Sequence, residues 1–436
     1  MRLLKRISIF VLLAAIIAFV SLWAFVQYAR HQSYDTAIHQ DATMLIRVDK
    51  YSIYKQLLPD YIKGGSTKHA DFLNGIELPA NVFIYNVKNR SATTLITSLP
   101  IENIEDLKKS LNNSTWQPMQ QAGGITNVQS SDGKWTMMFD KERIAISFSL
   151  DKEDVNSILT DILSQKNTKT VAESGFKDIA NQDGHITFMQ GKNTAAANFV
   201  DGCIEIEFAL TETSIKPKQN ISRKKFAENN ALIMWLYADI SDAIAGRVFE
   251  VDTFTISADS LLAAHPTGFE LAITKPVMQR DSVVTYEYND DFEKVATVTV
   301  KETAIPGLSA TIYTNGNAAA DYLRRQGAIT ADRASVSRQF FPLYQLYTSA
   351  TENTLILSTL KTTDSNSSMM QESSFFGLDA NIAQLLAQPE LAVLKPYGKL
   401  LSAIKVRANT NGKNTIKGSA SIHFLNKEKN ALLQLY

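Results

Sequence analysis

Cysteine is almost absent from this sequence: Cys203 is the only one in 436 residues. A single cysteine cannot form a disulfide within one chain, so stability must come from packing, even in a compartment that permits disulfides. Cys203 opens the stretch 203–210, in which apolar residues alternate with charged ones. This pattern predicts that Cys203 is a small buried side chain of a strand.

An excess of either charge is also absent, because 44 basic residues balance 44 acidic ones and no long run of either sign occurs. A protein that binds nucleic acid normally concentrates positive charge to meet the phosphates. We therefore expect no nucleic-acid partner.

The common catalytic and metal-binding motifs are missing as well. The six histidines never come closer than eight residues, so the paired histidines of a helical zinc site are absent; they are His31, His39, His69, His185, His265 and His423. The chain also lacks a Gly-x-Ser-x-Gly elbow, a phosphate-binding loop and an Asp-x-Asp triplet. The sequence therefore predicts no catalytic, cofactor-binding or metal-ligating residue and no cofactor, and it favours a protein that is not an enzyme.

A long uncharged run is present at the beginning of the chain. Ile7 to Val26 contains 20 uncharged, mostly apolar residues, preceded by Arg2, Lys5 and Arg6. In a helix, 20 residues at about 1.5 Å each span roughly 30 Å, the thickness of the hydrocarbon layer of a bilayer. Residues 1–30 are therefore predicted to be a short cytoplasmic tail and a transmembrane signal anchor.

The flanking residues indicate the topology of this segment. Basic residues near a membrane helix remain in the cytoplasm, which predicts a cytoplasmic N-terminus and an extracytoplasmic C-terminal part, periplasmic or at the cell surface. A cleaved signal peptide and a buried helix are the alternatives. Trp23, Tyr28 and Arg30 crowd the place where cleavage would occur, and the apolar core exceeds the length usual in signal peptides, so an uncleaved anchor is favoured.

A recurring pattern follows the predicted polar stalk, residues 31–41. A short apolar strand leads to Asp or Asn and then to a helix with apolar residues three and four apart. The polar residues at these junctions are Asp49, Asp151, Asp239, Asn315, Asn317 and Asp379. We interpret them as helix caps, because a side-chain oxygen there accepts a hydrogen bond from an unpaired backbone N–H group.

Between these units the chain is rich in β-forming residues. We expect strands at 81–87, 93–99, 134–140, 251–257, 268–274, 282–288 and 295–301. The segments 404–408 and 416–422 flank Asn411-Gly412, which is typical of a tight hairpin. Tight turns join antiparallel strands, so the predicted class is α+β: an antiparallel, β-rich ectodomain with helices packed on the sheets, after one N-terminal transmembrane helix.

Two domains are expected from the length of the ectodomain. The polar stretch 212–225, with Pro217 and few apolar residues, is the predicted boundary, giving a first α+β domain at 42–215 and a second at 226–436. The strand-Asp-helix unit restarts at 232–246, which suggests a duplicated domain. The strands that follow do not align closely, so duplication and chance recurrence both stay open.

Several polar and aromatic residues are candidates for a site. Glu205 and Glu207 alternate with apolar residues and are interpreted as the solvated face of a strand. Asp290-Asp291 is interpreted as a hairpin turn. The aromatic stretch 340–347 is interpreted as the start of a core-facing helix; if its aromatic side chains are instead exposed, it becomes a candidate binding surface.

The layout of one short anchor, many short strands and a terminal hairpin resembles that of membrane-anchored, envelope-exposed bacterial proteins of unknown function. The segments 77–83 (ELPANVF) and 426–433 (NKEKNALL) carry this resemblance. It implies a fold of repeated β-rich modules and implies no activity.

We therefore expect a single-span envelope protein, anchored in the membrane through Ile7 to Val26, whose ectodomain binds or scaffolds an envelope protein or polymer. The alternative is a hydrolase of envelope polymers with a site between the two domains. Asp290, Glu293 and His265 are the candidates for such a site, because they are polar residues near predicted strand ends.

Overall fold

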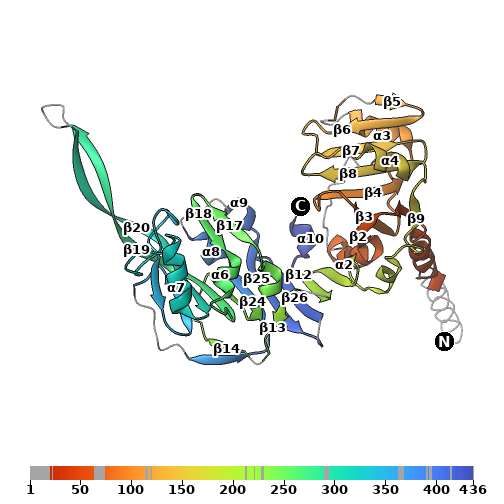
Figure 1. Cartoon of the computed structure of the whole chain (residues 1–436). Coiled ribbons are helices and arrows are strands. Elements are labelled where there is room, and N and C mark those ends of the chain that lie inside the picture. Colours follow the sequence, from red (N-terminus) through yellow and green to blue (C-terminus); the bar gives the residue numbers. More distant parts are fainter. Residues whose placement is uncertain are drawn as a thin grey trace. The chain divides into compact units, whose positions relative to one another are not determined.

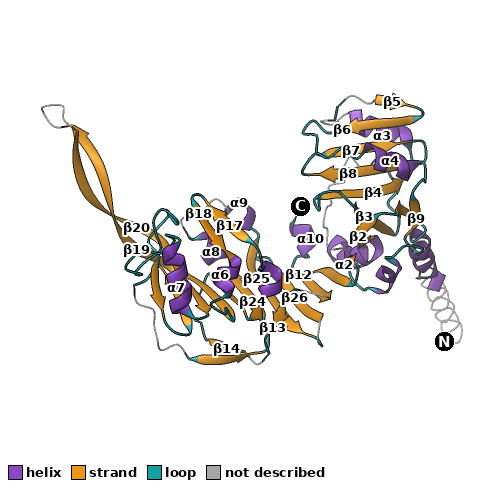
Figure 2. Ribbon diagram, viewed as in Figure 1, coloured by secondary structure: helices purple, strands orange, loops and turns teal. Residues whose placement is uncertain are grey.

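The computed structural model of the chain is rich in β-strands, which pair antiparallel, with helices beside the sheets (Figure 2). It describes residues 20–21, 23–62, 74–112, 116–117, 120–211, 214–219, 221–226, 230–288, 294–361, 368–388, 391, 395–412 and 415–435. The predicted antiparallel α+β architecture is confirmed. The chain divides into two compact units, unit 1 ending at Val200 and unit 2 running from Asp201 to Tyr436.

The polar stretch 212–225, for which we expect a domain boundary, falls within unit 2. Its described part forms β13 (Lys216–Pro217) and β14 (Ile221–Lys224), which pair with β16 (Ala238–Asp239) and β23 (Met369–Glu372). Ile221 and Arg223 are buried. Strand pairing and these two buried side chains therefore integrate a segment that looks like a linker in sequence.

The N-terminal region is described only in part. Most of the predicted membrane segment, Ile7 to Val26, lies outside the described residues, which begin with 20–21 and continue from 23. Residues 23–33 are helical. In the part of the chain that the structure describes, we find no helix with the length and apolar character needed to cross a membrane.

The segment 31–41, for which we expect a stalk, packs against unit 1. Its β1 (Ala37–His39) pairs with β9 (Thr168–Thr170). Ser33, Ile38 and His39 are buried. Burial of Ile38 and the backbone hydrogen bonds between β1 and β9 together hold this segment on unit 1.

Unit 1 is built on a nine-stranded antiparallel sheet of described strands, in the order β11-β10-β2-β3-β4-β8-β7-β6-β5. These strands are β11 (Asn193–Val200), β10 (Ile186–Gln190), β2 (Ala42–Asp49), β3 (Asn81–Val87), β4 (Thr94–Pro100), β8 (Arg143–Ser149), β7 (Trp135–Phe139), β6 (Ile125–Gln129) and β5 (Gln120–Ala122). The helices are α2 (Lys50–Ile62), α3 (Ile104–Asn112), α4 (Asn156–Leu163) and the 3-10 helix η2 (Lys177–Asn181).

The two faces of this sheet have separate cores. Ile158 and Leu159 of α4 pack in a cluster with Met138. Leu107 of α3 packs in a second cluster with Met137. Because consecutive residues of a strand point to opposite faces, Met137 and Met138 assign α3 and α4 to opposite sides of the sheet.

Unit 2 also has a nine-stranded antiparallel sheet of described strands, in the order β12-β26-β25-β24-β15-β19-β20-β22-β21. These are β12 (Cys203–Thr211), β26 (Thr415–Phe424), β25 (Leu401–Thr410), β24 (Phe376–Asn381), β15 (Leu232–Leu236), β19 (Gly268–Tyr288), β20 (Lys294–Tyr313), β22 (Thr354–Ser358) and β21 (Tyr347–Ala350). The helices are α5 (Ser241–Ile244), α6 (Ala258–Leu262), α7 (Gly316–Arg325), α8 (Ile382–Leu386), α9 (Lys395–Gly398) and α10 (Ala431–Gln434).

The predicted hairpin at Asn411-Gly412 is confirmed, since β25 and β26 pair antiparallel and Gly412 has a φ of 79°. The predicted strand 251–257 is instead a hairpin of β17 (Val248–Val251) and β18 (Phe254–Ser257), which turns at Asp252 with a φ of 52°. The predicted strands 268–274 and 282–288 are one long strand, β19. With β20 it forms a ribbon that extends from unit 2 (Figure 1).

The two units share a chain connectivity. In unit 1, β2, β3 and β4 are followed by α3, the pair β7-β8, and then β10 and β11. In unit 2, β15, β19 and β20 are followed by α7, the pair β21-β22, and then β24 and β25. In both sheets the first of these strands lies between the second and the returning strand, β10 or β24, and the third pairs with β8 or β22.

Two of the predicted helix caps, Asp49 and Asn315, are confirmed, whereas Asp379 and Asp151 have other hydrogen-bond partners. Asp49 accepts a hydrogen bond from Ser52 N (3.0 Å), and Asn315 accepts one from Ala318 N (3.1 Å). Asp379 instead pairs with Arg407, and Asn381 caps α8. Asp151 accepts from the Thr93 hydroxyl.

Candidate functional site

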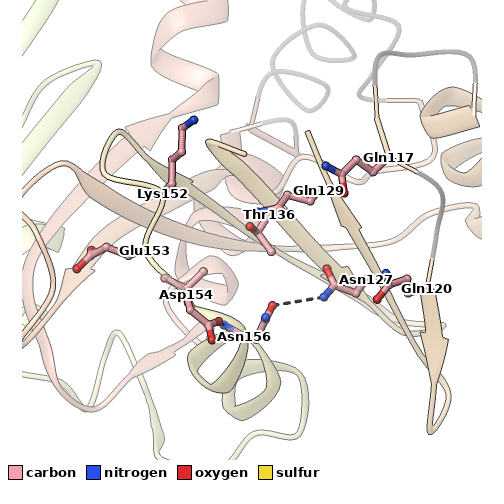
Figure 3. Close-up of a pocket in the computed structure, with 10 residues that line it drawn as sticks. Gln117, Gln120, Asn127, Gln129, Thr136, Lys152, Glu153, Asp154 and Asn156 are labelled. Atoms are coloured by element: carbon pink, nitrogen blue, oxygen red, sulfur yellow. Dashed lines mark hydrogen bonds between the residues drawn. The ribbon is translucent and has the colours of Figure 1, made fainter. Parts of the chain in front are cut away.

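A polar cleft of about 250 Å³ lies in unit 1, where the sheet face extends past the start of α4 (Figure 3). Strands β5, β6 and β7 form one wall, and the loop that leads into α4 forms the other. The lining is dominated by side-chain amides: Gln117, Gln120, Asn127, Gln129 and Asn156, with Thr136, Lys152, Glu153, Asp154 and Val155.

Strand register brings the amides of the sheet wall together. Gln120 of β5 pairs with Asn127 of β6, and Gln129 of β6 pairs with Thr136 of β7. Asn127 and Gln129 are two residues apart, so they share a face, while Val128 between them is buried on the other side. This alternation gives β6 one polar face and one core face.

The helix wall is fixed by a short hydrogen-bonded loop. The backbone N–H of Glu153 donates to Ser149 Oγ (3.1 Å), and Asn156 N donates to Asp154 Oδ1 (3.0 Å). Asn127 Nδ2 donates across the cleft to Asn156 Oδ1 (3.4 Å). The two walls are therefore linked at one point by a long amide-amide hydrogen bond.

The charges around the cleft are largely committed to the protein itself. Glu153 Oε2 accepts hydrogen bonds from Ser91 N (3.0 Å) and from the Thr94 hydroxyl. Neighbouring Asp151 accepts hydrogen bonds from the side chains of Ser91 and Thr93, which lower the pKa of its carboxyl. Lys152 offsets one of the two carboxylates of the lining, Glu153 and Asp154, so the cleft carries a formal charge of −1.

The chemistry of this arrangement is hydrogen bonding without proton transfer. Each amide offers two N–H donors and one carbonyl acceptor and does not titrate. A chain of hydroxyl and amide groups matches this pattern of donors and acceptors. The cavity is smaller than the roughly 300–1,000 Å³ of typical small-molecule sites.

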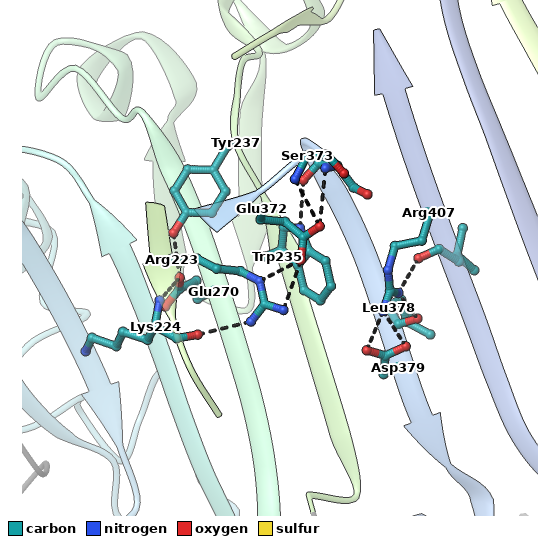
Figure 4. A network of polar contacts seen from close by, with 12 residues as sticks. Arg223, Lys224, Trp235, Tyr237, Glu270, Glu372, Ser373, Leu378, Asp379 and Arg407 are labelled. Carbon is teal, nitrogen blue, oxygen red and sulfur yellow. Dashed lines mark hydrogen bonds and ion pairs between the residues drawn. The ribbon is translucent and has the colours of Figure 1, made fainter. Parts of the chain in front are cut away.

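A second polar cluster lies on the sheet of unit 2, where β14 crosses it (Figure 4). Trp235 is fully buried, and the guanidinium carbons of Arg223 and Arg407 lie 4.0 Å and 4.7 Å from the ring centroid. Arg223 pairs with Glu372 (3.1 Å), and Arg407 pairs with Asp379 (2.7 Å). Each cation stacked on the indole therefore has its own carboxylate.

Glu270 completes this cluster from β19 and is 1 % exposed. Its Oε1 accepts hydrogen bonds from Tyr237 Oη (2.5 Å) and from Lys224 N (3.1 Å). Burial, followed by the bond to Glu270, raises the pKa of Tyr237 well above its usual range, and burial raises the pKa of Tyr313 to about 12. Because Lys224 N of β14 donates to Glu270 and Arg223 of β14 stacks on Trp235, we interpret the cluster as the support that holds β14 on the sheet.

The structure does not bring the hydrolase candidates into a described site. His265 is exposed, with a φ of 53°, in the turn between α6 and β19. Asp290 and Glu293 lie outside the described residues, as does the predicted turn Asp290-Asp291. Among the described residues, no group of three or more His, Cys, Asp or Glu side chains is placed to hold a metal ion.

The other weighed residues have structural roles. Glu205 and Glu207 are exposed on β12, which confirms the solvated strand face, and Cys203 is buried with its thiol pKa raised by burial. The aromatic stretch 340–347 is not helical, but Tyr344 is buried and Phe340 packs edge-on against Phe254 at 5.2 Å between ring centroids. Phe340 and Tyr344 therefore contribute to the core.

The cleft amides were missed by sequence reasoning. The stretch 117–121 (QPMQQ) is rich in glutamine, but this composition is equally typical of a solvated turn. The alternation of Asn127 and Gln129 around Val128 was a usable signal for a polar strand face. The proximity of this polar face of β6 to the loop before α4 depends on long-range packing, which no local sequence pattern encodes.

No protein-family model and no curated protein matches the chain. Two solved structures are similar over most of its length, crystal forms I and IV of the protein TP0453, with 9% and 8% sequence identity and a TM-score of 0.23 each. The matches cover 74% and 73% of this chain and 89% and 87% of the other. At this TM-score the likeness carries no inference about fold or function.

Proposed function

We propose that this protein is a single-span envelope protein whose extracytoplasmic part binds a neutral polymer that carries hydroxyl and amide groups, such as an N-acetylated glycan. The amide-lined cleft of unit 1 is the observation that supports this proposal. The protein is a binding module and not an enzyme.

The chemistry of the cleft suggests the class of polymer. Side-chain amides exchange hydrogen bonds with both hydroxyl and acetamido groups, and the formal charge of −1 disfavours a polyanion. Val155 is the single apolar residue in the lining and is buried, so hydrogen bonds supply most of the affinity. Since each contributes a net 0.5–1.5 kcal/mol, roughly, we expect a dissociation constant of about 0.1–1 mM for a short oligomer.

The anchor is proposed from the sequence. Ile7 to Val26 spans the membrane, the basic residues Arg2, Lys5 and Arg6 remain in the cytoplasm, and residues from Arg30 onward lie outside it. Attachment to the membrane compensates for a weak site, because many anchored copies facing one polymer bind it together.

Calorimetric titration of the full chain in lipid nanodiscs tests the polymer. The probes are a tetramer of N-acetylglucosamine and a tetramer of glucose, which lacks the acetamido groups. We expect the acetamido tetramer to bind more tightly, and the variant Gln129→Ala to weaken its binding by about 2- to 10-fold through loss of one hydrogen-bonding side chain.

Gln190→Ala is the matched control, since Gln190 is also an exposed glutamine at the end of a strand of unit 1. It should leave binding unchanged. Absence of binding to either tetramer, or equal binding by wild type and Gln129→Ala, would refute the proposed polymer site.

We also propose that the two units arose by duplication. The connectivity shared by β2 to β11 and β15 to β25 supports duplication, because strands that are equivalent in chain order take equivalent positions in the two sheets. If duplication is right, the equivalent strands of the two units should superpose in the same order; a different strand direction at any equivalent position would contradict it.

A further inference from the structure

Helix α2 carries large apolar side chains on a face that the described part of unit 1 leaves uncovered. Leu58 is 55% exposed and Ile62 is 77% exposed. Tyr54 and Tyr61 are also exposed, and all four follow helical spacing. Residues three and four apart lie on one side of a helix, so these four form a continuous stripe, which we term the α2 stripe.

The stripe adjoins the residue of α2 that packs on unit 1, because Leu57 is three residues from Tyr54 and four from Tyr61. Leu57 is 5% exposed and is the buried residue of the helix. A surface helix normally buries its apolar side, but here only Leu57 is buried and the four residues of the stripe are exposed. The α2 stripe therefore indicates a second apolar environment.

The end of the N-terminal helix lies beside the start of α2. Gln27 and Arg30 line a cavity of about 330 Å³ together with Ser52. Phe25 and Tyr28 line another, of about 610 Å³, together with Tyr51. The segment that follows the apolar run thus shares two cavities with the first turn of α2.

Polar contacts fix this helix end on the sheet of unit 1. Arg30 Nη2 pairs with Asp49 Oδ2 at 2.9 Å, directly before α2. Asn81 Nδ2 donates to Ser33 Oγ (2.8 Å), and Arg47 Nη1 donates to Tyr34 Oη (2.9 Å). The apolar run therefore connects to unit 1 without an intervening flexible linker in the described residues 23–41.

We propose that α2 lies in the headgroup region of the membrane that anchors the chain, with the α2 stripe in contact with lipid. The inference rests on the proposed anchor. The fixed helix end supports a lipid surface as the occupant, because it holds the start of α2 next to the point where the chain leaves the bilayer.

The residue types also fit this environment. Tyr54 and Tyr61 are amphipathic aromatic residues of the kind that settle at the headgroups, and Lys55 provides a cation for lipid phosphate. On the N-terminal helix, Trp23 and Tyr28 are also exposed. Both helices therefore carry exposed aromatic residues of the type that settles at the headgroups.

Spin labels in the full-length protein, reconstituted in vesicles of phosphatidylcholine and phosphatidylglycerol, test the proposal. Leu58→Cys places a label on the stripe, and Gln56→Cys places a comparison label at a half-buried position on the other side of the same helix. Both variants carry Cys203→Ser, which removes the only native thiol. Collision with oxygen, which partitions into lipid, is compared with collision with a water-soluble nickel complex.

We expect the ratio of oxygen to nickel collision rates to be several-fold higher at position 58 than at position 56. Equal ratios would place the stripe in water and overturn the proposal. Protection of the position 58 label from both reagents would mean that protein covers the stripe, which would overturn it equally.

A carbonate wash of the same vesicles separates this inference from the proposals on which it depends. A chain that washes off refutes the anchor. A chain that stays bound with a water-exposed label at position 58 refutes the lipid contact alone. Titration of the tetramer of N-acetylglucosamine into the Leu58→Cys protein reports the cleft independently, because none of the cleft residues belongs to α2.

Discussion

Gly377 is required by the buried tryptophan of unit 2, and its replacement by alanine should destabilise that unit. Gly377 of β24 pairs with Trp235 on one side and Arg407 on the other. A Cβ atom at this position would lie 2.1 Å from Cζ2 of Trp235. The ring has little freedom to move, because Nε1 of Trp235 donates a hydrogen bond to Ser374 O (3.0 Å) and Arg223 stacks on it at 4.0 Å.

Added atoms in a well-packed core cost about 1–3 kcal/mol. For a domain of this size, each kcal/mol lowers the melting temperature by roughly 2–4 °C, so Gly377→Ala should lower that of unit 2 by about 2–12 °C. Trp235 is the only tryptophan in residues 201–436, so its fluorescence reports this unit in a thermal melt of a protein in which Trp23, Trp116 and Trp135 are replaced by phenylalanine. Gly175→Ala of unit 1 is the control for the added methyl group, because no atom lies within 4 Å of its Cβ, and its melt is followed by circular dichroism, which reports both units.

The control should change the free energy of unfolding by less than about 0.5 kcal/mol. A Gly377→Ala protein that melts at the wild-type temperature would show that Trp235 can move aside. The close packing of Trp235 against β24, and the reasoning built on it, would then be wrong.

Three further changes test other parts of the structure. Tyr237→Phe removes the hydroxyl that donates to buried Glu270 and should cost about 1–3 kcal/mol in urea unfolding, whereas an unchanged midpoint would contradict the supporting role of the cluster. His185 is buried, its pKa is lowered by burial, and its Nδ1 accepts a hydrogen bond from Phe199 N (2.9 Å). Neutral His185 should stabilise the fold fully above 6.5, the pKa of histidine in the unfolded chain, and less as the pH drops towards its lower pKa in the folded state. His185→Gln should therefore lessen the loss of stability between pH 7.5 and 5.5. Asp49→Ala removes both the α2 cap and the ion pair with Arg30, and loss of the cap alone should destabilise unit 1 by about 0.5–2 kcal/mol in urea unfolding; a smaller effect would argue against the cap.

The fold class could be predicted because strand alternation and turn residues are local signals. The hairpin at Asn411-Gly412 is an example, since the turn pair and its flanking strands adjoin in the sequence. The predicted strand 251–257 failed for a similarly local reason. Asp252 adopts a left-handed conformation and turns the chain within what looks like one strand.

Long-range contacts account for the features that local patterns did not reveal. Asp379 resembles a helix cap, but Arg407 of the neighbouring strand binds it, and Asn381 caps α8 two residues later. The polar stretch 212–225 joins unit 2 because Ile221 is buried there. The cleft was invisible in sequence for the same reason, because Asn127 and Asn156 are separated by 29 residues.

The proposal of a polymer-binding cleft is tested most directly by a pair of adjacent residues. Gln120 lines the cleft, whereas Gln121, the next residue of β5, points to the opposite side, and both are exposed. In calorimetric titration of the full chain with the tetramer of N-acetylglucosamine, we predict that Gln120→Ala weakens binding by about 2- to 10-fold and that Gln121→Ala leaves it unchanged. Equal affinity of the two variants would contradict the account.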